Sequence, residues 1–169
     1  MADDPGRSPA LRAGPVTIDI AAPAALVLQM LAAIGQGAQR TGERTAVIER
    51  NGGRLIADFW TPVALPLGRR RVVRTREAVD VRHRDRVEYE HLDGPLRGLR
   101  ETIRVEAQDG RRCRLVYEGE YPVRNIASRA VFVLVARASL ERAVREHFED
   151  LGPRAEARAA RSQVFPTSG

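Results

Sequence analysis

The sequence contains no lysine: all 28 of its basic residues are arginine, against 22 acidic residues, for a net charge of +6. Such a complete absence points to codon bias in a GC-rich genome rather than to a functional need for guanidinium groups. It therefore weakens any inference from basicity to nucleic-acid binding. The single cysteine, Cys113, excludes an internal disulfide bond and a cysteine-based zinc cluster.

Long hydrophobic runs are also missing. The longest weakly polar stretch, residues 20–34, is interrupted by Pro23 and Gln29 and falls short of the roughly 18 to 20 apolar residues that a membrane span needs. Asp3 and Asp4 stand where a secretory signal would have a basic start and an apolar core. We therefore expect a cytoplasmic protein without a membrane span.

The composition is that of one soluble globular domain, with 169 residues, 43% of them hydrophobic and 30% charged. Residues 1–14 mix Pro, Gly, Ser and charged residues without a period, which predicts a flexible tail. Residues 15–152 are expected to form the domain. Gly152 and Pro153 are expected to break or kink its last helix, which leaves residues 153–169 as a helical extension and a frayed tail.

Hydrophobic periodicity predicts the order of elements. Residues 16–20 alternate as a strand does, and residues 23–34 follow as a helix with Leu26, Met30 and Ile34 on one face, ended by Gly35 and Gly37. Period-two alternation then predicts six strands, at residues 44–50, 54–60, 70–81, 85–92, 98–107 and 111–121. The connections are short, so these strands are expected to be antiparallel.

The last third of the sequence is helical in pattern. Apolar residues recur at steps of three, four and seven and form one stripe: Ile126, Ala130, Val133, Leu140, Val144, Phe148 and Leu151. A curved sheet has one face to cover, and one long helix can cover it. The sequence thus predicts an α+β fold, in which a seven-stranded curved antiparallel sheet wraps around a long C-terminal helix and leaves a ligand cavity.

Three segments resemble the START-like, or SRPBCC, superfamily, in its polyketide cyclase/dehydrase and coenzyme-Q-binding branch. They are VTIDIAAPAALVLQML at residues 16–31, DGPLRGLRETIRVE at residues 93–106 and ARASLERAVREHFEDL at residues 136–151. The resemblance implies the helix-grip fold over about residues 16–151. This fold hosts carriers, cyclases, hydrolases and ribosome-associated proteins, so it does not by itself define an activity.

Strand alternation predicts which side chains face the interior. Leu99, Ile103 and Val105 share one face, and they carry Glu101 inward with them. The same argument on the other strands predicts an apolar interior with a few polar groups: Thr75, Glu77, Tyr89, His91, Glu101, Tyr117 and Tyr121. An apolar pocket with sparse polar groups is what a hydrophobic ligand requires.

The catalytic candidates are Arg76, Glu77, Glu101 and Tyr117. A carboxyl group in an apolar cavity can exchange protons near neutral pH, and a phenol can hold a carbonyl oxygen. In the aromatase/cyclases that the sequence resembles, an inward arginine faces the substrate. An alignment without gaps puts Glu77 at the position of this arginine. An alignment that allows a turn longer by one residue puts Arg76 there instead.

The expected ligand-binding residues are Phe59, Val73, Thr75, Tyr89, His91, Ile103, Leu115, Tyr121, Val133, Leu140 and Val144. Structural alternatives stay open for the polar members: Glu77 and Glu101 in ion pairs with arginines or at the rim, the tyrosines as ordinary sheet residues, and His91 as a packed, hydrogen-bonded residue. The histidines show no metal-ligand spacing, and no cofactor motif is present, so we expect neither a metal nor a cofactor.

The resemblance, together with these residues, implies two functions, with a weaker third. The first is a polyketide cyclase, aromatase or dehydratase that works by general acid–base chemistry on a hydrophobic ligand or an acyl-carrier-bound ketide. The second is a non-catalytic carrier of a lipid, quinone or polyketide. The third, a ribosome- or RNA-associated protein, rests on the positive charge alone, and we do not expect nucleic acid as the partner. A homodimer stays open.

Overall fold

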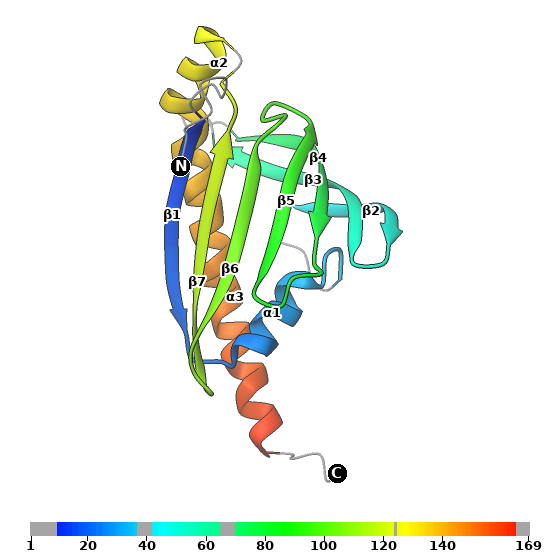
Figure 1. Ribbon diagram of the computed structural model, residues 1–169, viewed down its shortest axis with the longest axis vertical. Helices are drawn as coiled ribbons and strands as arrows, with labels where there is room; N and C mark the ends of the chain where they lie inside the picture. The colour runs from blue at the N-terminus through cyan, green and yellow to red at the C-terminus, as the bar shows by residue number, and fades with distance from the viewer. Residues whose placement is uncertain (1–9, 37–41, 65–69, 124, 165–169) are drawn as a thin grey trace, which may run out of the picture.

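Seven antiparallel strands form one sheet in the order β1-β7-β6-β5-β4-β3-β2, and a long C-terminal helix runs along one face of this sheet (Figure 1). The computed structural model describes residues 10–36, 42–64, 70–123 and 125–164. The strands are β1 (Leu11–Ile20), β2 (Arg44–Asn51), β3 (Arg54–Ala64), β4 (Arg70–Asp80), β5 (Arg86–Asp93), β6 (Arg100–Asp109) and β7 (Arg112–Tyr121). The helices are α1 (Ala24–Ala32), α2 (Ile126–Val131), the π-helical turn η2 (Phe132–Ala136) and α3 (Arg137–Val164). The α+β fold predicted from the sequence is confirmed.

The first strand begins earlier than the sequence predicts. Residues 1–9 of the expected tail lie outside the described residues, but Leu11 already pairs with Tyr121. A bulge between Ala13 and Val16 then shifts the register. Gly14 occupies this bulge with φ of 84°, and a Cβ there would lie 2.7 Å from the carbonyl oxygen of Tyr117, so a glycine is needed. Gly14, which the sequence assigned to the tail, therefore lies in a bulge within a strand.

Helix α1 starts directly after Pro23, as expected for a proline at a helix start. Its buried residues are Val27 and Leu31, whereas Leu26, Met30 and Ile34 are only partly buried against the core. The helix is thus rotated by about one residue from the predicted face. Gly37, which was expected to help end it, lies outside the described residues.

Helix α3 is held along β1 by two carboxylates. The backbone N–H of Gly14 donates to Glu141 Oε1 at 2.8 Å, and that of Ala21 donates to Glu156 Oε1 at 3.0 Å. The sequence predicted a break or a kink at Pro153 with a helical extension after it. The helix is not broken there, because Pro153 lies inside α3, which continues to Val164. Burial of Ala155 and Ala159 in the core outweighs the hydrogen bond that proline cannot donate. Residues 165–169 of the expected frayed tail lie outside the described residues.

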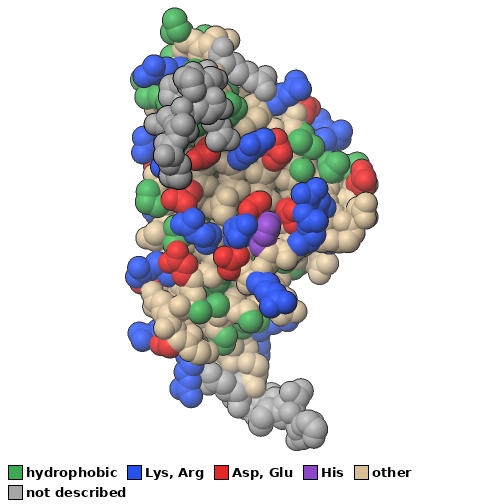
Figure 2. Space-filling view, in the orientation of Figure 1, with side chains coloured by type: hydrophobic (Ala, Val, Ile, Leu, Met, Phe, Trp, Pro, Cys, Tyr) green, Lys and Arg blue, Asp and Glu red, His purple; other side chains and the backbone are tan. Residues whose placement is uncertain are grey.

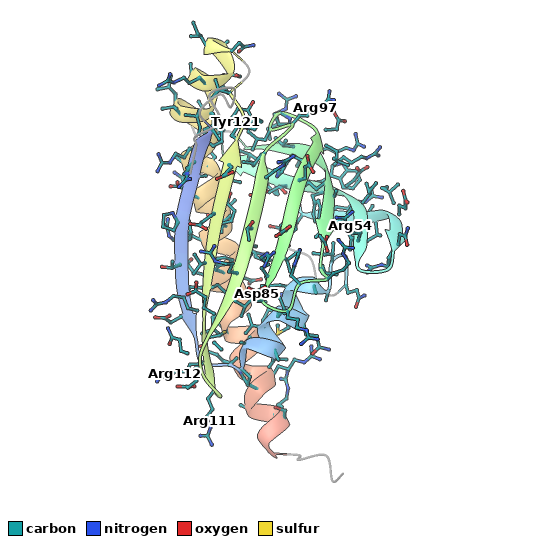
Figure 3. All side chains as sticks on the ribbon, viewed as in Figure 1. Arg54, Asp85, Arg97, Arg111, Arg112 and Tyr121 are labelled. Carbon is teal, nitrogen blue, oxygen red and sulfur yellow. The ribbon has the colours of Figure 1, made fainter. Side chains whose placement is uncertain are left out.

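The beginning of the helical region differs from the predicted stripe. Ile126 is 88% exposed and Val133 is 53% exposed, so neither lies against the sheet. Phe132 takes the buried position instead and stacks on Tyr121, labelled beside α2 in Figure 3, with ring centroids 4.8 Å apart. Val133 was expected to line the ligand cavity; it is half-exposed, and its contact with a ligand stays a prediction. Among the described residues, no helix is both long and apolar enough to cross a membrane.

A charged cluster fixes the outer side of β3 and β4. Asp58 is buried there, and it accepts hydrogen bonds from Arg74 at 2.8 Å and from Arg76 at 2.7 Å. These contacts, first the hydrogen bond from Arg76, lower the pKa of Asp58 to about 2 against the effect of burial. The carboxylate therefore compensates two arginines that would otherwise repel each other.

We expect the fold to lose stability as the pH falls from about 4 to about 2, since the pKa of Asp58 is lower in the folded than in the unfolded chain. Asp58→Asn should lower the free energy of unfolding by about 1 to 3 kcal/mol at neutral pH and reduce this acid dependence. Urea unfolding at several pH values measures both effects. The control is Asp85→Asn, because the Asp85 side chain is 60% exposed and pairs with Arg86, outside this cluster. Equal acid dependence in all three proteins would contradict the assignment.

Candidate active site

The inner face of the sheet carries the polar groups that strand alternation predicted. On β6, Ile103 and Val105 are buried against the core, and Leu99 is buried just before it. Glu101 lies on the same face, with its side chain 11% exposed. On β7, Leu115 and Tyr117 are buried in the same way. The apolar members thus bring Glu101 and Tyr117 into the interior, because neighbours two residues apart on a strand share a face.

A bulge between β4 and β5 brings His91 opposite Glu77. The register changes from Arg76↔Asp93 to Glu77↔His91, so that β5 has one more residue than β4 at this point. Both Glu77 and His91 are buried, and they face the interior together. The bulge leaves Arg76 and Asp93 on the opposite, outer face.

Hydrogen bonds connect these groups into one cluster. His91 Nε2 lies 2.5 Å from Glu101 Oε2, and the Tyr117 hydroxyl donates to Glu101 Oε1 at 2.8 Å. His91 Nε2 also lies 3.6 Å from Glu77 Oε1, which accepts a hydrogen bond from the Thr75 hydroxyl at 2.6 Å. The structure therefore brings together five of the residues that the sequence predicted, from four adjacent strands.

Gly119 makes the contact between Tyr117 and Glu101 possible. Glu101 pairs directly with Gly119 across the two strands. Tyr117 pairs with Ile103, so its side chain reaches Glu101 diagonally across the same face. A Cβ atom at residue 119 would lie 2.8 Å from the Tyr117 hydroxyl oxygen. The sequence analysis missed Gly119. A glycine within an otherwise regular strand was the available signal, since such a glycine often marks a close approach.

Burial and charge shift the pKa values in this cluster. Burial raises the pKa of Glu77, and the nearby His91 opposes the shift. Burial lowers the pKa of His91, but the hydrogen bond to Glu101 and the charges of both carboxylates outweigh it, so that the net shift is upward. Burial, together with the adjacent carboxylates, also raises the pKa of Tyr117 and Tyr89, so both phenols stay protonated as donors.

The same cluster offers one imidazole nitrogen and two carboxylate oxygens within 4.8 Å of one another, from His91, Glu77 and Glu101. The spacing of these residues in the sequence did not show this set, because they lie on three different strands. Transition metals accept such donors. A histidine that binds metal almost always donates its other ring N–H to a partner. His91 Nδ1 is buried and, in the described part of the chain, has no hydrogen-bond partner. Within this part of the chain, the imidazole therefore lacks the second partner that usually supports a metal-bound histidine.

Arg76 does not belong to this cluster. Its guanidinium binds Asp58 on the outer side of the sheet, opposite Glu77. Of the two alignments that the sequence left open, the structure has Glu77 facing the interior. The reason is the regular pairing of β3 with β4, which places Asp58 beside Arg76 and the buried Ala57 beside Glu77.

The other expected ligand-binding residues lie around the cluster or the core next to it. Leu115, Ile103 and Tyr121 are buried. Phe59, Tyr89, Leu140 and Val144 are partly buried and pack against the core, and Val73 is partly buried on β4. Their contact with a ligand stays a prediction.

A groove of about 750 Å³ crosses the other, outer face of the sheet. Its lining includes Ile56, Ala78, Glu90, Arg100 and Glu120, which follow one another in register from β3 to β7. Acidic and basic side chains alternate over this face in Figure 2. A mixed surface of this kind is typical of a solvated sheet face, and it differs from the apolar pocket predicted on the inner side.

The strand order and the long C-terminal helix are those of the helix-grip fold. Residues 15–156 match the family "Polyketide cyclase / dehydrase and lipid transport", and the chain belongs to this family. No curated protein matches the sequence.

Solved structures share the fold at low sequence identity. The Zhui aromatase/cyclase from Streptomyces sp. R1128 has a TM-score of 0.57 and 22% identity, over 95% of this chain and 98% of that one. A START superfamily protein from Mycobacterium smegmatis has a TM-score of 0.58 and 13% identity, over 89% and 98% of the two chains. The di-domain ARO/CYC StfQ from the steffimycin biosynthetic pathway has a TM-score of 0.58 and 16% identity, over 92% of this chain and 53% of that one.

The cluster makes a prediction about His91. Glu101→Gln removes the charged acceptor at Nε2, so the pKa of His91 should fall and the imidazole should lose its proton at lower pH. NMR titration of the imidazole protons measures this shift, with His91→Asn to assign the signal. Glu118→Gln is the matched control, because Glu118 lies on the outer face opposite Thr102. A His91 titration that is the same in all glutamine variants would contradict the geometry.

Proposed function

We propose that the protein binds a hydrophobic, carbonyl-rich small molecule of the polyketide type and catalyses its cyclisation or dehydration by general acid–base chemistry. The observation that supports this function best is the buried cluster of Glu77, His91, Glu101 and Tyr117 on the inner face of the sheet. Two carboxyl groups and an imidazole that share protons inside an apolar interior are costly to bury. Acid–base chemistry is a function that uses such an arrangement.

Glu77 is the proposed base. Burial raises its pKa toward neutral pH, and as a carboxylate it can accept a proton from a carbon between two carbonyl groups. The resulting enolate carbon attacks a second carbonyl carbon of the same chain and closes a ring. The new alkoxide takes a proton from His91, which recovers it from Glu77, 3.6 Å away.

The Tyr89 hydroxyl is the proposed donor to a carbonyl oxygen. Tyr89 keeps its proton because its pKa is raised by burial. Tyr117 donates its one O–H to Glu101 and so orients this carboxylate toward His91. This assignment replaces Arg76, which binds Asp58 on the outer face. The names of Zhui and StfQ as an aromatase/cyclase and an ARO/CYC support the reaction class.

Glutamine substitutions separate catalysis from binding. We expect Glu77→Gln to retain ligand affinity and to lower the rate of ring formation about 100- to 10,000-fold, because the amide keeps the size of the side chain but cannot accept the proton. The measurement is the product distribution with a reconstituted ketide-forming system, beside a direct binding titration. Glu118→Gln on the outer face is the control and should behave like the wild type.

The same assay tests the alternative that the protein is a carrier without chemistry. A carrier would give the same products with the wild type, with Glu77→Gln and without protein, while both proteins still bound the ligand. Parallel loss of affinity and rate in Glu77→Gln, with both retained in the control, would instead assign Glu77 to ligand binding and contradict its role as the base.

A further inference from the structure

The helical segment Ile126–Ala136, here called the helix tip, exposes more large aliphatic side chains than any part of the sheet. Ile126 is 88% exposed and Leu134 is 77% exposed, and Val131, Val133 and Val135 are each between 46% and 59% exposed. The tip comprises α2 and the π-helical turn η2 and extends beyond the ends of the strands (Figure 1). A soluble chain rarely exposes so many aliphatic residues together unless they meet a partner.

Acidic residues are missing from the segment itself. Residues 121–140 contain no aspartate or glutamate. Arg129 and Arg137 flank the aliphatic residues and are exposed, and Arg137 pairs with Glu141 at 2.9 Å. In Figure 2, basic side chains lie near hydrophobic ones at this end of the molecule. Aliphatic residues with flanking arginines are typical of helices that enter an anionic lipid surface.

The directions of the side chains favour lipid over a protein partner. Val133, Leu134 and Val135 are consecutive, and successive residues of a helix point about 100° apart. All three are exposed nonetheless. A flat protein surface would cover only one side of this segment. Acyl chains can surround it.

We propose that the helix tip docks the protein on an anionic lipid surface, with Ile126, Val131 and Leu134 among the acyl chains and Arg129 at the lipid phosphates. Phe132 anchors the tip to the domain by stacking on Tyr121. The docked protein lies at the surface as a peripheral protein. This inference is independent of the catalytic cluster.

Vesicle flotation with the full chain tests the proposal. The probe is equimolar phosphatidylcholine and phosphatidylglycerol vesicles without any added ligand. The wild type should float with these vesicles, and Leu134→Glu should lower the partition coefficient about tenfold or more. The matched control is Ile48→Glu, since Ile48 is 56% exposed on β2, away from the tip, and this variant should float like the wild type. Both substitutions are at exposed sites, and circular dichroism verifies that the variants remain folded.

Charge is tested separately from apolar insertion. Pure phosphatidylcholine vesicles, or about 1 M sodium chloride, which limits charge interactions to about 3 Å, should weaken binding of the wild type.

Failure of the wild type to float, or equal flotation of Leu134→Glu, overturns the proposal. The wild type could instead be a dimer that Leu134→Glu converts to a monomer, with neither protein binding vesicles. That result overturns the proposal and assigns the tip to contact with a second copy of the chain. Glu77→Gln should float like the wild type, so this test and the catalytic assay fail independently.

Discussion

The alternation of side chains along a β-strand is the constraint on which the candidate site depends. Burial of Leu99, Ile103 and Val105 determines which face of β6 meets the core, and Glu101 must then lie inside with them. Burial of a carboxylate is unfavourable without partners, and His91 and Tyr117 supply them. The hydrophobic effect thus holds an ionisable cluster in place, and the hydrogen bonds reduce the cost of its burial.

The sequence predicted the strand order, the long helix and most inward residues, because each follows from local periodicity. It could not decide between Arg76 and Glu77, since this choice depends on pairing between strands. Two non-local features decide it: the regular β3–β4 register beside Asp58 and the bulge that sets His91 opposite Glu77. The distances within the cluster were likewise inaccessible from the sequence, because its members lie on different strands.

The helical errors have a different cause. The predicted apolar stripe assumed one regular helix from Ile126, but the π-helical turn at residues 132–136 changes the phase between the tip and α3. Phe132 is therefore buried, and Val133 is half-exposed. At the other end, proline and glycine predicted a break or a kink, and the packing of Ala155 keeps the helix unbroken. Local propensity fails in both places where tertiary contacts determine the conformation.

The two proposals concern two energetically unfavourable features of one small domain, buried ionisable groups and exposed aliphatic groups. The interior holds acidic and basic groups away from water, where their proton affinities shift, whereas the helix tip exposes aliphatic groups that would be more stable away from water. The stack of Phe132 on Tyr121 joins the tip to β7, the strand that also carries Tyr117 and Gly119. A hydrophobic ligand has low solubility in water, and a tip that binds lipid would bring the domain to a phase in which such a ligand is concentrated. In this arrangement, β7 connects the helix tip, where the protein would take up a ligand from lipid, to the cluster that would catalyse its reaction.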